Sequence, residues 1–383
     1  MVDFTSMVGG GIAQLLPYRM GKPLELMQAQ LKAPHLLRLN AGESPYGVSR
    51  KVREILGRAE ELLARYPDSG CYYLKDTLKR LCGYELNHIT VGADCAELIS
   101  LLCRALVTPQ VNVIIPQLSS LTLDRAATIA GAAIIPTSIM DDWTPDFDAI
   151  LDAINERTRM IMLANPSIPI GAFALKSRVT DFLSQVPEDV IVVIDEALSD
   201  YLGQGYEDFY SLLSLYPNLV LLRSFSHAYG LAGLRIGYML SHEQICGICN
   251  VLRDPYNVST LAQECAIAAL HDKTFVTYVV KQTGVQRRRY RDFCAKYGFA
   301  LIDTRTCSVT IDFGANAERY YQELLRQGIF TRPLSYLGLN SLLNITLGTP
   351  EENSLVLKTL ETMALSDAYV LSRVARSQRS SLN

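Results

Sequence analysis

Short apolar segments alternate with amphipathic segments between residues 88 and 194, and this alternation limits the possible folds more than any other feature. Strands are predicted at residues 88–91, 111–115, 133–136, 160–164 and 190–194, and helices at 95–106, 121–130, 147–154 and 177–183. Strands that are apolar on both faces and are joined by helices form a mostly parallel sheet covered on both sides. The sequence therefore predicts an α/β fold with a large, doubly wound, mostly parallel sheet.

The pattern changes beyond residue 256, where the helices become longer. Helices are predicted at residues 260–270, 274–296, 317–327 and 352–363, and strands at 299–302, 309–313 and 343–347. These elements predict a second, smaller α/β domain at the C-terminal side. The predicted parts of the chain are an N-terminal arm at 1–38, a large domain at 39–256, a small domain at 257–365 and a polar tail at 366–383.

The composition is typical of a globular protein and excludes some classes of partner. Of the 383 residues, 49% are hydrophobic and 20% are charged, which is enough apolar material for full cores. The net charge of -3 gives no basic field for nucleic acid, and no apolar stretch approaches the ~20 residues of a membrane helix. The opening residues lack the basic start of a signal peptide. We expect a cytoplasmic protein with a small-molecule substrate and without a nucleic-acid or membrane partner.

The nine cysteines lack the paired spacings of a disulfide framework, which favours reduced thiols. Cys246 and Cys249 have the gap of a redox or zinc pair, but no second pair or nearby histidine completes a site. We interpret both as helix-packing residues and predict no metal site. Cys95 stands at a predicted helix start, which would favour a reactive thiolate; the alternative is a plain small residue.

Residues 224–238 form a loop between two apolar segments and read Ser-Phe-Ser-His-Ala-Tyr-Gly-Leu-Ala-Gly-Leu-Arg-Ile-Gly-Tyr. This loop closely resembles the cofactor-lysine loop of histidinol-phosphate aminotransferases, whose usual form is Ser-Lys-Ala-Phe-Gly-Leu-Ala-Gly-Leu-Arg-Ile-Gly-Tyr. The chain is thereby similar to the class I/II aminotransferases, which are fold-type-I transferases dependent on pyridoxal phosphate (PLP). Where that family has its lysine, the resemblance places His227 in this chain.

Other segments resemble the same family, and the resemblance extends over residues 18–364. Residues 39–47 are similar to its Asn-Glu-Asn-Pro-Tyr-Gly motif, and residues 165–171 to its Asn-Pro-Asn-Asn-Pro-Thr-Gly motif. Residues 195–198 read Asp-Glu-Ala-Leu and are similar to the family's Asp-Glu-Ala-Tyr. The resemblance implies the fold-type-I transferase fold and a homodimer, in which the arm serves the neighbouring subunit.

Several positions that hold the cofactor in the family are retained. Asp195 matches the aspartate that contacts the pyridine nitrogen of PLP. Arg235 matches the phosphate-binding arginine, and Ser224 and Ser226 stand beside it as hydroxyl donors. The resemblance therefore implies an anion site in this part of the chain.

A second part of the implied anion site is the turn at residues 92–97, which opens a helix. Amides at a helix start can hold a phosphate, and Asp94 and Cys95 stand at this start, although the family's serine and aspartate are here cysteine and alanine. Tyr66 matches a tyrosine that, in the family, reaches the same phosphate across the dimer. We take these residues as further candidate cofactor contacts.

Other family positions have changed, mostly toward apolar residues. His227 has no primary amine and cannot form the imine that begins transamination. By the resemblance, Leu121 replaces the stacking aromatic residue, and Ile168 and Leu198 replace two residues that contact the ring oxygen. The loss of two hydrogen bonds and one stacking contact, at ~1 kcal/mol each, would weaken cofactor binding by about 3 kcal/mol.

The substrate side of the implied site has changed as well. Asn344 stands where the family places an arginine for the anionic end of its substrate, and Arg332 is the substrate-side arginine that is left. The candidate substrate-binding residues are therefore Arg332, Asn344, Leu121, Ile168 and Leu198.

Four functions are consistent with these residues. The favoured one is a repurposed, aminotransferase-like small-molecule enzyme of specialised metabolism that uses His227 and Asp195 for acid–base chemistry without ordinary transamination. The alternatives are an enzyme that binds PLP or pyridoxamine phosphate (PMP) non-covalently for elimination or isomerisation, a non-catalytic subunit, and a conventional aminotransferase. For His227 alone, drift in a dead pocket is a further alternative. The expected cofactor is non-covalent PLP or PMP, or none.

Overall fold

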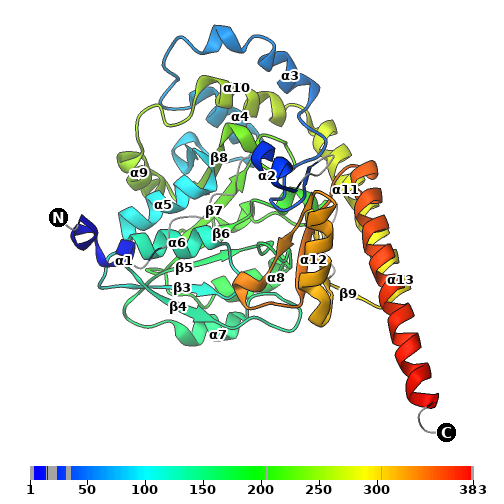
Figure 1. Cartoon of the computed structure of the whole chain (residues 1–383). Helices are drawn as coiled ribbons and strands as arrows, with labels where there is room; N and C mark the ends of the chain where they lie inside the picture. Colours follow the sequence, from blue (N-terminus) through cyan, green and yellow to red (C-terminus); the bar gives the residue numbers. More distant parts are fainter. Residues whose placement is uncertain are drawn as a thin grey trace. The chain divides into compact units, whose positions relative to one another are not determined.

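The structure is a computed structural model of the chain that describes residues 4–13, 15, 24–31, 36–203, 206–302 and 304–380 (Figure 1). The chain divides into two compact units. Unit 1 contains residues 1–18 and 46–280, and unit 2 contains residues 19–45 and 281–383.

Unit 1 is built on a mixed sheet that has seven strands among the described residues. In sheet order the strands are β2 (Ile89–Gly92), β8 (Gly237–Ser241), β7 (Leu219–Ser224), β6 (Ile191–Asp195), β5 (Thr158–Ala164), β3 (Asn112–Pro116) and β4 (Ala133–Thr137). All neighbours from β7 to β4 are parallel, whereas β8 is antiparallel to both β7 and β2. The predicted α/β fold with a mostly parallel sheet is confirmed.

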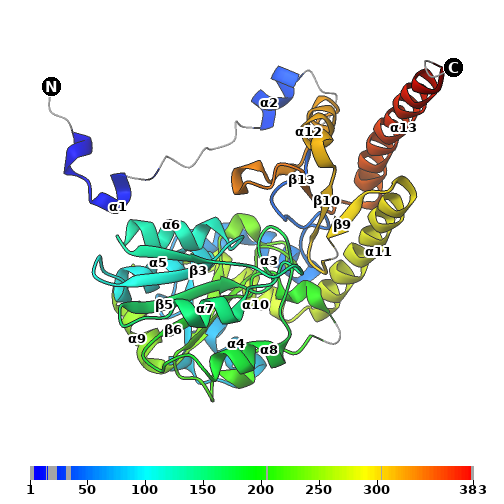
Figure 2. The same ribbon diagram turned by 90° about the horizontal axis from the view of Figure 1, so that it is seen from below.

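Helices cover both faces of this sheet. The helices of unit 1 that the structure describes are α1 (Gly10–Ala13), α3 (Arg50–Leu56), α4 (Tyr72–Cys82), α5 (Asp94–Leu106), α6 (Leu121–Ile129), α7 (Phe147–Ala153), α8 (Lys176–Leu183), α9 (Glu243–Leu252) and α10 (Thr260–Leu270). Figure 2 shows α5 and α6 on one side of the sheet and α4 and α8 on the other. Short 3-10 turns occur at Phe4–Met7, Ala59–Leu62, Leu86–His88, Ser199–Leu202, Tyr210–Leu212 and Ala232–Leu234.

The central strands contribute to two separate cores because successive side chains of a strand point to opposite faces. Ile194 and Leu221 belong to the core shared with α3, α4, α7, α8 and α10. Val193 and Leu222 belong to the other core, which includes side chains of α5, α6 and α9. Burial on both faces explains why these strands appear in the sequence as continuous apolar runs.

The strands of unit 1 bring their functional ends to one edge of the sheet. β2 and β7 run in the same direction because both are antiparallel to β8. The ends of β2, β3, β5, β6 and β7 therefore lie together with the start of β8, and we call this side the carboxyl edge. Ligands of doubly wound sheets bind outside such an edge.

Unit 2 contains a smaller antiparallel sheet and several helices. The sheet has four strands among the described residues, in the order β12 (Arg332–Pro333), β13 (Leu342–Thr346), β10 (Ser308–Asp312) and β9 (Ala300–Ile302). A separate parallel pair joins β1 (Leu37–Arg38) to β11 (Ile329–Phe330). The helices are α2 (Leu24–Leu31), α12 (Ala317–Arg326), α13 (Pro350–Ser380) and most of α11 (Lys273–Tyr297), with 3-10 turns at Gly314–Asn316 and Ser335–Leu337. Across the described residues, no helix combines the length and apolar character that crossing a membrane requires.

The boundaries of the two units differ from those expected. α10 packs against α3 and α4, so the division follows residue 280 rather than 256. The expected arm, residues 1–38, is divided between the units, and its residues 1–3, 14, 16–23 and 32–35 lie outside the described ones. The expected tail, residues 366–383, is helical up to Ser380, because residues 351–380 contain neither glycine nor proline; residues 381–383 are not described.

Gly237 allows the first residues of α5 to approach β8, and its substitution tests this close packing. A Cβ at Gly237 would lie 2.8 Å from the backbone oxygen of Arg223 and 3.1 Å from the backbone nitrogen of Cys95. Since both contacts are backbone atoms, we expect Gly237→Ala to lower the free energy of unfolding by about 2 kcal/mol. Gly247→Ala, in α9 with open space around it, is the matched control and should be neutral or stabilising by up to ~1 kcal/mol. Equal unfolding midpoints in denaturant for the two variants would contradict this account.

Candidate functional site at the carboxyl edge of unit 1

Most of the predicted cofactor and catalytic residues lie at the carboxyl edge. Asp195 is the last residue of β6, and Ser224 is the last residue of the neighbouring β7. Ser226 and His227 follow in the loop after β7, and Arg235 precedes β8. The parallel sheet thus brings together residues that are far apart in the sequence.

Asp94 and Cys95 reach the same edge from the other side of β8. They are the first residues of α5, which begins directly after β2. Gly92 at the end of β2 pairs with Gly237 at the start of β8, and Ser224 at the end of β7 pairs with the same glycine. The beginning of α5 is therefore held beside the loop that follows β7.

The carboxylate of Asp94 accepts hydrogen bonds from four groups, which we call the donor cluster. The Ser224 hydroxyl donates to Oδ1 at 2.7 Å, and the backbone N–H of Cys95 donates to the same oxygen at 2.8 Å. The Ser226 hydroxyl donates to Oδ2 at 2.9 Å, and the Arg235 guanidinium forms an ion pair with Oδ2 at 2.5 Å. These donors include the side chains that the sequence assigned to an anion site.

The role of Asp94 in the structure differs from the one that the sequence predicted. The sequence predicted Asp94 as one of several groups that hold an external anion, but its own carboxylate is the anion that the donor cluster binds. Burial alone would raise the pKa of Asp94, but the Ser224 hydrogen bond and the Arg235 charge outweigh burial and lower that pKa below its ordinary value. Asp94 is therefore ionised at neutral pH.

The backbone around this ion pair is held in uncommon conformations. Asp94 has φ +73° and Arg235 has φ +51°, in the left-handed region that favours glycine. Aspartate tolerates this region better than most residues do, yet such positions persist only when surrounding contacts hold them. Here the contacts are the donor cluster and the close approach of the α5 turn to Gly237. Both charged partners are thus fixed by their local backbone as well as by each other.

Asp195 is a buried carboxyl at the same edge, and the four hydrogen bonds of the donor cluster go to Asp94 and not to Asp195. Only 4% of the residue is exposed, and its Oδ1 accepts the backbone N–H of Ala197 at 3.0 Å. Burial, aided by the nearby charges of Asp94 and Glu196, raises the pKa of Asp195 from its ordinary value to about 7. A carboxyl in this state exchanges its proton near neutral pH.

Cys95 is not a reactive thiolate in this structure. Burial, together with the negative charges of Asp195 and Asp94, raises the pKa of the Cys95 thiol well above its ordinary value. These effects outweigh the helix start, which led us to consider a lowered pKa from the sequence. The Cys95 thiol is therefore expected to stay protonated at neutral pH.

His227 is half-buried in a tight turn that follows β7. Its backbone oxygen accepts the N–H of Gly230 at 3.0 Å. Gly230 has φ +75°, and a Cβ at this position would lie 2.0 Å from the backbone oxygen of Gly47. The loop around His227 therefore lies against Gly47 and Val48, and any residue other than glycine at position 230 would force this backbone to shift.

The three predicted apolar residues also follow strands that end at the carboxyl edge. Leu198 follows β6 and is buried, Ile168 follows β5 and is half-buried, and Leu121 begins α6 after β3 and is 45% exposed. β3, β5 and β6 are neighbours in the sheet. Apolar side chains thus occur along the β3–β6 half of the edge, and the charged donor cluster occurs at the β7–β2 half.

The remaining predicted residues lie elsewhere in the two units. In unit 2, Asn344 on β13 is buried and donates from its amide to Ser308 Oγ at 3.0 Å and to Thr310 Oγ1 at 2.9 Å. Arg332 on β12 pairs across the strands with Asn344, and its guanidinium lies 5.3 Å from the ring centroid of Tyr336. The Asn344 amide thus joins strands of the small sheet.

Tyr66 and the Cys246–Cys249 pair also have defined surroundings. Tyr66 in unit 1 is 83% exposed and stacks on Tyr256 at 4.8 Å between ring centroids. Cys246 and Cys249 are both buried in the core that α9 forms with α5. In the part of the chain that the structure describes, no group of three or more His, Cys, Asp or Glu residues could hold a metal ion.

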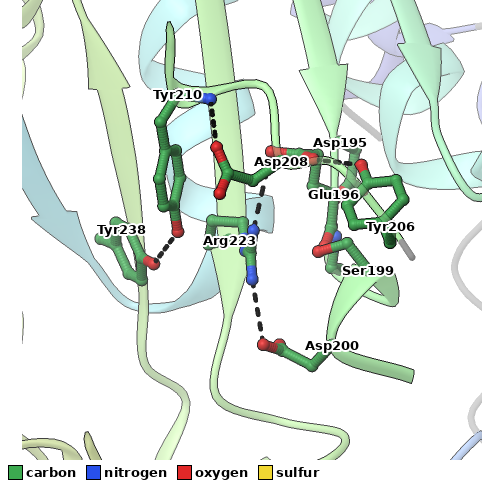
Figure 3. Close-up of polar contacts among 10 residues, drawn as sticks. Asp195, Glu196, Ser199, Asp200, Tyr206, Asp208, Tyr210, Arg223 and Tyr238 are labelled. Atoms are coloured by element: carbon green, nitrogen blue, oxygen red, sulfur yellow. Dashed lines mark hydrogen bonds and ion pairs between the residues drawn. The ribbon is translucent and has the colours of Figure 1, made fainter. Parts of the chain in front are cut away.

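Sequence reasoning missed a buried charge network behind the edge, which Figure 3 shows. Arg223 on β7 forms an ion pair with Asp200 at 2.9 Å and lies 3.8 Å from Glu196, and Figure 3 shows its guanidinium between these two carboxylates. Glu196 is fully buried, and the Tyr206 hydroxyl donates to its Oε1 at 2.6 Å. The available signal in the sequence was an arginine within an apolar strand, Arg223, together with two acidic residues just after the preceding strand, Glu196 and Asp200. Only the pairing of the two strands shows that these three charges meet.

Comparison with known proteins now places this geometry in a family. Residues 34–360 match the family described as aminotransferase class I and II. The chain is 35% identical to histidinol-phosphate aminotransferase 2 of Haemophilus influenzae over 353 residues, which are 92% of this chain and 96% of that protein. The chain belongs to the class I and II aminotransferase family.

Two further comparisons agree with the family. The chain is 34% identical to the histidinol-phosphate aminotransferase of Bacillus subtilis over 350 residues, which are 91% of this chain and 97% of that enzyme. The crystal structure of histidinol-phosphate aminotransferase from Sinorhizobium meliloti in complex with pyridoxal-5'-phosphate has a TM-score of 0.85 and 26% identity, and covers 94% of this chain and 98% of that one. The predicted relation to histidinol-phosphate aminotransferases is therefore confirmed at the level of the family and fold.

Aminotransferases of this family depend on PLP, so the donor cluster can be tested against the phosphate of that cofactor. A phosphate needs hydrogen-bond donors that are not already engaged with another anion. The Ser224, Ser226 and Arg235 side chains and the Cys95 amide are all directed at the Asp94 carboxylate. The arrangement of these residues therefore does not fit a phosphate group.

Arg223→Ala is predicted to destabilise unit 1 strongly. The substitution would leave Glu196 and Asp200 without their shared cation, and the Arg223 side chain is only 10% exposed. Removing one partner of a buried ion pair costs about 3 kcal/mol or more. Arg50→Ala is the control, since Arg50 pairs with Glu54 on the surface, and it should change stability by less than about 0.5 kcal/mol. Comparable unfolding midpoints for the two variants would show that the buried network contributes nothing.

Asp195→Asn is predicted to stabilise the protein more at pH 8 than at pH 5. Because the pKa of Asp195 is raised in the folded state, the native protein binds a proton that the unfolded chain releases, and stability falls as pH rises from about 4 toward 7. Asparagine removes this pH-dependent cost, which is at most roughly 4 kcal/mol. Thermal unfolding at both pH values measures the difference, with the exposed Asp189→Asn as control. An identical effect of Asp195→Asn at pH 5 and pH 8 would refute the raised pKa.

Proposed function

We propose that this chain is a small-molecule enzyme that retains the aminotransferase fold but works by acid–base chemistry through Asp195 and His227. The observation that carries this proposal is the state of Asp195, a buried carboxyl at the carboxyl edge whose pKa is raised to about 7. A general acid or base works best when its pKa lies near the working pH. Asp195 has this property without a bound cofactor.

His227 is the second proposed acid–base group. It follows β7, and Asp195 ends the adjacent parallel strand β6, so both residues belong to the same edge of one sheet. Histidine is the side chain most often used for proton transfer in enzymes. By the family resemblance it stands where a lysine would form the imine with PLP, and an imidazole cannot form that bond. The proposed enzyme therefore does not carry out ordinary transamination.

The proposed substrate site lies along the β3–β6 half of the carboxyl edge. Leu121, Ile168 and Leu198 would bind an apolar part of the substrate, and Asp195 and His227 would exchange protons with its reacting part. Arg332, which belongs to unit 2, stays a sequence-based candidate for binding an anionic group of the substrate. The alternative of non-covalent PLP or PMP in an elimination or isomerisation would require the cofactor phosphate to bind away from the donor cluster or to displace Asp94 from it.

A conventional histidinol-phosphate aminotransferase is the second candidate. The curated relatives support it, because the H. influenzae and B. subtilis proteins at 35% and 34% identity carry that name. The engaged donor cluster and His227 speak against it, since both bear directly on the phosphate and the imine of the cofactor. A non-catalytic subunit is the third candidate, but a buried, protonatable Asp195 would have no use in it.

We further propose that the chain forms a homodimer in the cytoplasm. The exposed Tyr66, stacked on Tyr256, is the residue proposed to face the neighbouring subunit. An aromatic pair on the surface is a common element of protein interfaces. Sedimentation of the wild-type protein and of Tyr66→Ala would measure this assembly.

The first functional test is a transamination assay with the purified protein. With histidinol phosphate, PLP and a 2-oxo acid, we expect no amino acid to form from the oxo acid above the rate without protein. The B. subtilis enzyme under identical conditions is the positive control. Amino-acid formation by this chain at a rate comparable to that control would overturn the proposal and establish the second candidate.

The acid–base proposal is tested on any substrate that a ligand screen identifies. We expect His227→Ala to lower turnover by about 100-fold or more, because a positioned proton-transfer group contributes a factor of that order. His271→Ala is the control, since His271 is exposed at the end of α10. Unchanged turnover in His227→Ala would exclude a catalytic role for this residue.

A further inference from the structure

We infer that Asp94 is a built-in anion that occupies the phosphate position of this aminotransferase site, so that the site takes ligands without a phosphate group. The inference concerns binding specificity and holds whether or not Asp195 and His227 are catalytic. It rests on the hydrogen bonds of the donor cluster, on their charge balance and on the backbone that holds Asp94 in place.

The hydrogen-bonding capacity of the Asp94 carboxylate is fully used. Oδ1 accepts from Ser224 and from the Cys95 amide, and Oδ2 accepts from Ser226 and from Arg235. A carboxylate offers about four acceptor positions, so each donor of the cluster has a matched acceptor. A phosphate entering this position would have to displace the carboxylate from all four groups.

The groups of the donor cluster are also hydrogen-bonded to one another and to the nearby backbone, which leaves them little freedom to turn toward a second anion. The Ser226 N–H donates to the Ser224 hydroxyl at 3.0 Å. The other terminal nitrogen of Arg235 donates to the backbone oxygen of Ala232 at 3.0 Å and contacts the Ser226 hydroxyl at 3.4 Å. The cluster is therefore already organised around one acceptor.

The charge balance of the cluster also disfavours phosphate. Arg235 contributes one positive charge and Asp94 one negative charge, and the Asp94 side chain is only 11% exposed, whereas that of Arg235 is 53% exposed. A phosphate monoester carries about -1.5 to -2 charges at neutral pH. It would approach a buried carboxylate of the same sign with no second cation among the groups that contact Asp94. The negative charges of the phosphate and of Asp94 would repel each other strongly, because the site is partly desolvated.

The backbone keeps the Asp94 side chain directed into the cluster. Asp94 has φ +73° at the first position of α5, and this turn lies against Gly237 of β8, where a Cβ would be 3.2 Å from the Asp94 carbonyl carbon. A rotation of the side chain toward solvent would break its contacts with both serines and with Arg235. Glycine would adopt the same backbone without strain, so Asp94→Gly removes the anion while it preserves the turn.

The test measures binding of inorganic phosphate by isothermal titration calorimetry. We expect no saturable binding to the wild-type protein at millimolar phosphate. We expect saturable binding to Asp94→Gly, with a Kd at least about ten-fold below the highest phosphate concentration at which the wild-type protein shows none. The reason is that the vacated donors then make charge-assisted hydrogen bonds to the ligand. The gain should disappear in Asp94→Gly/Arg235→Ala, which places the phosphate at the donor cluster. In the single variant Asp94→Gly, pyridoxal phosphate should bind more tightly than pyridoxal, whereas the wild-type protein should not distinguish between them.

Two results would overturn the inference. One is saturable phosphate binding to the wild-type protein that Arg235→Ala abolishes, since phosphate would then share the cluster with Asp94. The other is the absence of any gain in both Asp94→Gly and Asp94→Ser, each shown to be folded by its thermal transition; the serine variant guards against failure of one substitution. Neither result depends on turnover, so failure of the acid–base proposal in His227→Ala is a separate outcome.

Discussion

The contact between Asp94 and the donor cluster ties together the three elements on which the candidate site depends. Asp94 begins α5, Ser224 ends β7 with Ser226 just after it, and Arg235 precedes β8. The sheet determines that these ends meet, because β2 and β7 both pair with the antiparallel β8. A single buried carboxylate then satisfies donors from all three, so the loop with His227 is anchored at both of its ends by the same ion pair and hydrogen bonds. In this way an electrostatic contact sets the shape of the carboxyl edge.

The same contact influences the chemistry of its neighbour Asp195. Asp94 is kept ionised by the donor cluster, and its negative charge adds to burial in raising the pKa of Asp195 to about 7. The same two carboxyl groups, together with burial, keep the Cys95 thiol neutral by raising its pKa well above its ordinary value. Two acidic residues at one edge therefore differ in protonation, because Asp94 has several donors and a cation whereas Asp195 is buried near two other carboxyl groups. Environments that separate the pKa values of neighbouring carboxyls in this way are typical of sites where protons are exchanged.

Much of the fold could be predicted from the sequence, whereas the central contact of the site could not. The strand at Val192–Ile194 and its neighbours are buried on both faces, which produces continuous apolar runs that local patterns identify well. The assignment of α10 to unit 1 depends on tertiary packing against α3 and α4, and sequence order suggested the other unit. The role of Asp94 depends on a left-handed backbone at one residue, which turns its side chain toward β7 instead of leaving it at a helix surface. A periodic sequence pattern cannot predict this change in the direction of one side chain. The buried Arg223 network was missed for a related reason, because its charges meet only through strand pairing.

Residues retained from a cofactor site need not be retained for the cofactor. In a PLP enzyme the two serines and the arginine would be held by the phosphate, but here they have a partner within the chain. Once Asp94 is in place, loss of Arg235 would leave a nearly buried carboxylate without its cation, which is costly whether or not a ligand ever binds. The donor cluster would thus be kept by stability alone, and its presence in the sequence does not distinguish a working cofactor site from a site that has replaced the phosphate with its own side chain. The residue that does distinguish the two is Asp94, because it alone changes the cluster from a receptor for an anion into a satisfied ion pair.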